Sequence, residues 1–86
     1  MYLRVLVPTE VPEGFADTGK EITEFYIQSE NMLFGYSVKR IIERYCLDME
    51  CMLGDILRIE HVQKCPMGIY SHVMDLVGRY IPPEQR

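Results

Sequence analysis

Apolar and polar residues alternate at the start of the chain. Leu3, Val5 and Val7 share one face of an extended segment, and β-branched residues are frequent there. The alternation predicts a strand over residues 2–8, with a proline as its last residue. Residues 9–18 then contain proline, glycine, aspartate and threonine, which is the composition of a loop.

From residue 19 onward the spacing of apolar residues lengthens to three and four. Thr18 and Glu21 have the spacing of a capping box, which satisfies free amide groups at the start of a helix. The stripe that follows consists of Ile22, Phe25, Tyr26, Ser29 and Leu33. This period predicts a helix over residues 19–34, ended by Gly35. A strand through residues 25–27 is the alternative, because aromatic and β-branched side chains favour sheets.

The longest helical stripe lies in the middle of the chain, after Ser37, whose hydroxyl is suited to capping a helix. Its members are Val38, Ile41, Ile42, Tyr45, Met49, Met52 and Leu53. At 100° per residue these side chains fall within one arc. They predict one helix over residues 37–53. Gly54 is expected to end it in the left-handed conformation that glycine adopts freely.

Two more elements are predicted in the last third of the chain. Residues 55–62 alternate between apolar and charged side chains, which favours a strand. Pro66 suits the first position of a helix, and the apolar residues after it cover a broad arc. They predict a helix over residues 66–81, followed by a short tail at 82–86 that begins with two prolines. The predicted order is β-α-α-β-α, in a single α+β domain over residues 1–86 that is mostly helical.

The length and composition fit a soluble globular protein. The chain has 86 residues, of which 48% are hydrophobic and 26% are charged. No apolar run reaches the roughly 20 residues that a membrane span requires, and the N-terminus lacks the pattern of a signal peptide. The three cysteines are an odd number, which favours a reducing compartment. We therefore expect a cytoplasmic protein without membrane contact.

The net charge of −4 argues against direct nucleic-acid binding, which usually needs a basic surface. The order β-α-α-β also occurs in KH-type RNA-binding domains, but these clamp RNA with a G-x-x-G loop that residues 34–37 lack. Residues 14–21 approach the pattern of a phosphate-binding loop, but Glu21 stands where a hydroxyl would bind magnesium. We expect no cofactor and no direct contact with nucleic acid.

Cysteine and histidine side chains are the candidates for chemistry. Ligand types that zinc prefers occur at Cys46, Cys51, His61 and Cys65. Their C-x4-C-x9-H-x3-C spacing matches no common structural zinc site, so free thiols are the simpler interpretation. Cys65 also precedes the predicted helix over 66–81, whose N-terminus would lower the pKa of the thiol. A thiol-redox or zinc-binding protein is therefore the alternative function. No catalytic residue is assigned.

An apolar residue off the helical stripe marks the strongest candidate surface. On the helix predicted over 37–53, Leu47 lies opposite the apolar stripe and beside two arginines. The candidate partner-binding residues are Arg40, Arg44, Leu47 and Cys51. Arginine and apolar anchors carry much of the binding energy at protein interfaces. The rival surface is the stretch 10–30, which holds six acidic residues and one lysine.

These features favour a binding module over an enzyme. A small domain with two predicted strands leaves strand edges open to another chain. The apolar arc of the last predicted helix is also wider than packing on one side requires. We expect a small acidic protein that acts as an inhibitor or adaptor by occupying the surface of a larger protein, and that forms homodimers. An inhibitor of a nucleic-acid-handling machine, of the kind that mobile elements encode, is one instance of this class.

Overall fold

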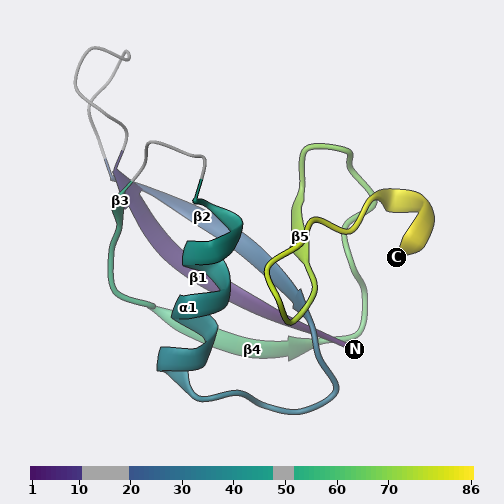
Figure 1. Cartoon of the computed structure of the whole chain (residues 1–86), viewed down its shortest axis with the longest axis horizontal. Coiled ribbons are helices and arrows are strands. Elements are labelled where there is room, and N and C mark those ends of the chain that lie inside the picture. Colours follow the sequence, from purple (N-terminus) through teal and green to yellow (C-terminus); the bar gives the residue numbers. More distant parts are fainter. Residues whose placement is uncertain (11–19, 48–51) are drawn as a thin grey trace.

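A computed structural model describes residues 1–10, 20–47 and 52–86 of the chain (Figure 1). Within these ranges the strands are β1 (Tyr2–Glu10), β2 (Lys20–Gln28), β3 (Met52–Leu53), β4 (Arg58–Val62) and β5 (His72–Met74). An α-helix, α1 (Gly35–Tyr45), follows β2, and a 3₁₀ turn, η1 (Pro83–Gln85), lies near the C-terminus. The strands form one sheet, and α1 lies across one of its faces (Figure 1).

The sheet is built around an antiparallel pair of long strands. β1 and β2 pair along their full length, with Val5 opposite Phe25. On the other side of β1, its first half pairs antiparallel with β4 and its last two residues pair with β3. β5 pairs in parallel with β2. The two long strands therefore lie in the centre, and β4 and β5 lie at opposite edges.

The main core lies between α1 and the sheet. Its buried residues are Leu3, Val5, Val7, Phe25, Ile27, Val38, Ile42, Cys46 and Met74. Side chains alternate along a strand, so Leu3, Val5 and Val7 of β1 all point toward the helix. The helix contributes Val38, Ile42 and Cys46, whose spacing of four places them on one stripe. Removal of this apolar surface from water is the main stabilising contribution to the fold.

A smaller apolar cluster lies on the opposite face of the sheet. Leu3 points toward α1, so the preceding residue, Tyr2, points to the opposite face of the sheet, where it packs with Val73 and Ile81. Cys65 packs against the same cluster. The chain after β4 therefore crosses this face on its way to β5 at the far edge.

The predicted strand over 2–8 is confirmed, but the predicted helix over 19–34 is wrong. Residues Lys20–Gln28 form β2, as the alternative for residues 25–27 proposed. Ile27, which lies off the helical stripe, is fully buried in the sheet. Pairing with β1 explains the difference. The sequence from 24 to 28 also alternates between inward and outward positions, and pairing with a neighbouring strand stabilises a segment with this two-residue period.

The predicted helix over 37–53 is confirmed only in its first part. The helix α1 ends at Tyr45, and Leu53 already belongs to β3, which pairs with the end of β1. Residues 48–51 lie outside the described part of the chain. Residues 9 and 10, which are predicted to begin a loop, belong to β1 instead, and residues 11–18 of that predicted loop lie outside the described part of the chain.

Gly54 does not end a helix and is not left-handed. Among the described glycines only Gly78 has a positive φ. Instead, the amide of Gly54 donates a hydrogen bond to the carbonyl of Pro8 at 2.8 Å. A Cβ on Gly54 would lie 3.1 Å from this carbonyl oxygen, so close contact with β1 is the reason for a small residue here.

The predicted helix over 66–81 is also wrong. This segment contains the three-residue β5, a turn, and an isolated bridge between Met74 and Tyr80. Two glycines in the segment disfavour a helix, and Gly78 adopts a φ of +82°. The predicted strand over 55–62 is confirmed in its last five residues, as β4. The α+β class is therefore confirmed, whereas the expectation of a mostly helical domain is wrong.

Candidate interaction surface

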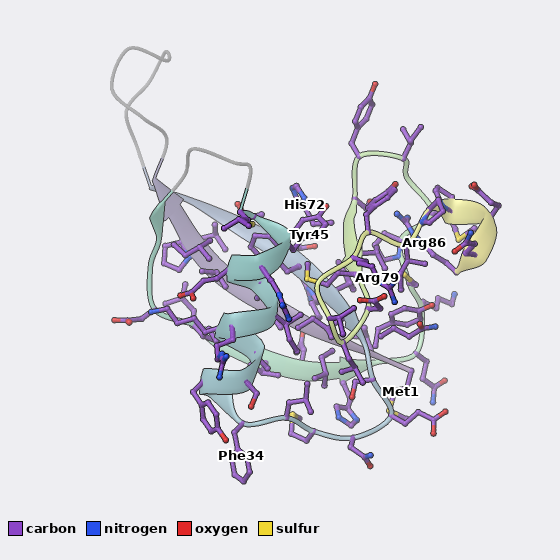
Figure 2. The ribbon with its side chains drawn as sticks, viewed as in Figure 1. Met1, Phe34, Tyr45, His72, Arg79 and Arg86 are labelled. Carbon is purple, nitrogen blue, oxygen red and sulfur yellow. The ribbon has the colours of Figure 1, made fainter. Side chains whose placement is uncertain are left out.

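A tight turn after β5 forms one wall of the candidate surface. The Asp75 carboxylate accepts hydrogen bonds from the amides of Val77 and Arg79, both at 2.9 Å. Arg79 Nε pairs with the other carboxylate oxygen at 3.2 Å (Figure 2). Burial alone would raise the pKa of Asp75, but the two amides and the Arg79 guanidinium hold it below its usual value. The turn is therefore a pre-formed structure.

Gly78 brings this turn against the backbone of α1. Its φ of +82° lies in the left-handed region that other residues rarely adopt. A Cβ here would lie 2.9 Å from the carbonyl oxygen of Ile41, and 3.1 Å from both the amide nitrogen of Tyr45 and the Cβ of Arg44. The turn therefore sits on the second half of α1 at a distance that only glycine permits.

A half-buried tyrosine–histidine pair joins the same helix to β5. Tyr45 on α1 and His72 on β5 lie side by side (Figure 2), and the tyrosine hydroxyl and His72 Nδ1 share a hydrogen bond at 3.1 Å. The imidazole also packs on the ring of Phe25, with 5.3 Å between centroids. Burial lowers the pKa of His72 and raises the pKa of Tyr45, so both are neutral near pH 7. The pair fixes the position of α1 relative to the strand that leads into the turn.

An open groove of about 510 Å³ lies between α1 and the turn. Its apolar lining consists of Tyr36, Ile41, Leu47, Leu76 and Val77. Leu47 is 79% exposed, and Leu76 and Val77 are 52% and 49% exposed. Single exposed apolar side chains are common, but several around one groove are typical of a binding surface.

Two arginines give the groove a positive charge. Arg40 and Arg44 are four residues apart on α1, so they lie one turn apart on the same face. Both are exposed, and neither forms an ion pair or side-chain hydrogen bond with any residue that the structure describes. By contrast, Arg4 bridges Glu24 at 2.6 Å and Glu60 at 2.8 Å. The groove thus carries cations that are available to a ligand.

The structure brings together three of the four residues that the sequence indicates. Arg40, Arg44 and Leu47 line the groove, and the prediction that Leu47 is exposed is confirmed. Cys51 lies outside the described residues. Leu76 and Val77 are not among the binding residues that the sequence indicates, because the sequence interpretation places both in the broad apolar arc of a helix over 66–81. The Asp75-x-x-Gly78 spacing, which is typical of a turn, was the available signal.

The cysteine candidates lie in separate places. Cys46 is buried in the core between α1 and the sheet, whereas Cys65 packs on the opposite face. No helix begins at Pro66, directly after Cys65, and burial raises the pKa of the Cys65 thiol rather than lowering it. No group of three metal-ligating side chains occurs among the described residues, and His61 is exposed on an edge strand. Because Cys51 lies outside those residues, the zinc-binding alternative stays a prediction that no observed contact favours.

A second exposed apolar surface lies on the loop before β5. Its exposed side chains are Met67, Ile69 and Tyr70. The Arg86 guanidinium (Figure 2) donates hydrogen bonds to the carbonyls of Pro66 at 2.5 Å and Gly68 at 3.0 Å. The hydroxyl of Tyr80 donates to the carbonyl of Ile69 at 2.8 Å. The predicted C-terminal tail is therefore a brace for this loop.

Comparison with known proteins identifies no relative of this chain. No protein-family model matches it, and neither a curated protein nor a solved structure shows significant similarity. Across the described ranges, no helix is long and apolar enough to cross a membrane. The groove is therefore the observation on which a function rests.

Proposed function

We propose that this chain is a protein-binding module of the cytoplasm that acts as an inhibitor or adaptor. It docks onto a larger protein through the groove between α1 and the turn at 75–79. The observation that supports this is the shared position of three exposed aliphatic side chains and two arginines that no described residue pairs. Apolar anchors and arginine together are the composition of binding hot spots.

The apolar lining has enough unburied surface to matter for affinity. Full burial of a leucine or valine side chain contributes about 1.5–3 kcal/mol. Leu47 has most of this contribution still available, and Leu76 and Val77 have about half of theirs. The three together can therefore contribute roughly 3–5 kcal/mol of gross binding free energy. The entropic cost of association opposes part of this gain.

A cross-linking experiment tests the proposal. A photoreactive amino acid at position 47 should label the natural partner in cells of the source, whereas the same group at position 57 should not. Leu57 is a matched control, because it is an exposed leucine outside the groove. With the purified partner, Leu47→Ala should weaken binding by more than about 1 kcal/mol and change folding stability by about 0.5 kcal/mol or less. Equal effects of Leu47→Ala and Leu57→Ala on binding would refute the proposal.

The edge of the sheet supports a further proposal, that two copies of the chain associate. β4 is an edge strand, and none of the described residues pairs with its outer side. In an antiparallel two-fold pairing centred on Ile59, Arg58 of one copy would lie opposite Glu60 of the other, which is a favourable cross-strand pair. Light scattering should then report a dimer well above micromolar concentration. A monomer at such concentrations would contradict the dimer and leave the groove proposal intact.

A further inference from the structure

We infer that the groove receives an acidic amphipathic helix of the partner protein, whose two carboxylates, four residues apart, face Arg40 and Arg44. This inference rests on the proposed function and names the chemistry of its partner. Three features of the groove support it: its charge, its apolar lining and the backbone of its walls.

Charge complementarity indicates an acidic ligand. Arg40 and Arg44 each present a planar set of donors that matches the two oxygens of a carboxylate. Two like charges one helical turn apart also repel each other, and an opposing pair of carboxylates relieves that repulsion. Acidic residues four apart on a facing helix have the matching spacing, because both helices have 3.6 residues per turn. The two arginines are therefore sufficient to pair with both carboxylates of such a helix.

The net charge of the groove argues against a polyanion. Glu43 also lines it, so two arginines and one glutamate leave a net charge of +1. Nucleic acids and anionic membranes are held by clusters of basic residues, and affinity for them grows with the number of cations. The chain as a whole is acidic, with a net charge of −4. A protein segment with a few well-placed carboxylates fits this surface better.

The apolar lining indicates an occupant with an apolar stripe. Leu47 lies two residues after the end of α1, where its amide donates a hydrogen bond to the carbonyl of Arg44 at 3.3 Å, and both side chains line the groove. Leu76 and Val77 face the same groove from the opposite wall. α1 has 11 residues and is therefore about 16 Å long, which matches an occupant of about three helical turns.

The backbone of the groove walls favours a helix over an extended peptide. An extended peptide needs partners for its own amides and carbonyls, as in strand addition to a sheet edge. Here one wall is a helix, and on the other the amides of Val77 and Arg79 already donate to Asp75. A helical occupant satisfies its backbone internally and needs only side-chain contacts.

Synthetic peptides test the inference directly. The probe is an amphipathic peptide of about 15 residues, long enough for partial helicity, with a leucine stripe and two glutamates four residues apart. Two matched peptides carry glutamine or lysine at those positions. Fluorescence anisotropy should show that the glutamate peptide binds about tenfold more tightly than the glutamine peptide and the lysine peptide most weakly. Amide chemical shifts should change in α1 and in residues 75–79.

Charge reversal provides the decisive variant. With Arg40→Glu and Arg44→Glu combined, the lysine peptide should bind more tightly than the glutamate peptide. The control, Lys39→Glu with Lys64→Glu, makes the same change in net charge at positions that do not line the groove and should preserve the original order. Thermal melts of each variant show that it is folded before binding is compared.

Three results would overturn the inference: equal affinity for the glutamate and lysine peptides, shift changes away from the groove, or no binding of any peptide to the folded protein. Equal shift changes with duplex DNA or anionic phospholipid vesicles would also overturn it. Failure of the proposed function is distinguishable. If the natural partner cross-links at position 47 but its affinity is unchanged by the reversal of Arg40 and Arg44, the inference fails and the proposed function stands.

Discussion

Replacement of Gly78 by alanine adds a single methyl group, yet it should destabilise this protein strongly. The glycine lies at the point where the turn after β5 rests on α1, and its φ is +82°. The added Cβ would meet the Ile41 carbonyl oxygen at 2.9 Å and the Tyr45 amide nitrogen at 3.1 Å. Both are helix backbone atoms, which cannot rotate away as a side chain can.

Two contributions set the magnitude. A left-handed conformation costs a residue with a Cβ about 1–2 kcal/mol relative to glycine. Relief of the contact with α1 requires the turn or the helix to shift, at a cost of about 1–2 kcal/mol, as in mild overpacking. Together they predict a loss of about 2–4 kcal/mol in the free energy of unfolding. For a domain of this size, that lowers the melting temperature by roughly 10–25 °C.

Urea denaturation followed by circular dichroism measures this loss, since the chain has no tryptophan for fluorescence. Gly35→Ala is the matched control: Gly35 is the first residue of α1, and no atom lies within 4 Å of its would-be Cβ. That variant should be neutral or up to about 1 kcal/mol more stable, because alanine favours helix. Gly78→Asn separates the two contributions, because asparagine tolerates the left-handed region but keeps the Cβ.

The reasoning is refuted if Gly78→Ala costs less than about 0.5 kcal/mol, the range of ordinary surface substitutions. Such a result would mean that the turn does not rest on α1 in solution. A loss in Gly78→Asn as large as that in Gly78→Ala would instead show that contact with the helix dominates over backbone strain. Because the turn forms one wall of the groove, Gly78→Ala should also weaken partner binding.

Three further outcomes are expected. Burial lowers the pKa of His72 below its usual 6.5, so the imidazole binds a proton more readily in the unfolded chain than in the folded one. The free energy of unfolding should therefore fall as the pH drops below 6.5. His72→Gln should flatten that dependence in urea melts recorded at a series of pH values. Arg86→Ala removes the brace from the loop at 66–71, so hydrogen exchange there should accelerate, whereas exchange in the central strands should not; equal acceleration in both would contradict a local role. Arg4→Met removes the ion pair of Glu24 and one of the two ion pairs of Glu60, so the pKa of Glu24 should rise toward its usual 4.5 and the acid midpoint of unfolding should move to higher pH; an unchanged midpoint would show that the bridge contributes little.

The first strand and the first part of the helix follow from local pattern. The alternation over 2–8 admits one interpretation, and the stripe through Val38 and Ile42 has only the helical period. For residues 24–28 both periods are present, and pairing with β1 decides between them. Ile27 is the residue in the sequence that favours the strand, because a large apolar side chain that lies off the helical stripe faces the core in a strand.

The end of the chain depends on tertiary contacts throughout. Residues 66–81 have a helical apolar period, but the short β5 owes its existence to an exposed edge of β2 that no local pattern reveals. The turn after it depends on Gly78 meeting the α1 backbone, a contact between segments more than thirty residues apart. Sequence separation of this kind is invisible to a window of neighbouring residues.

One wall of the candidate surface could be predicted from the sequence, whereas the other depends on tertiary contacts. Leu47 is exposed beside Arg40 and Arg44 as the predicted phase of the helix indicates, although it lies two residues beyond the end of α1. The facing wall, Leu76 and Val77, is placed by the turn and by the seating of that turn on α1. One wall of the groove was therefore determined by the sequence, whereas the groove itself was decided only by the tertiary structure, because it needs two segments that meet through folding.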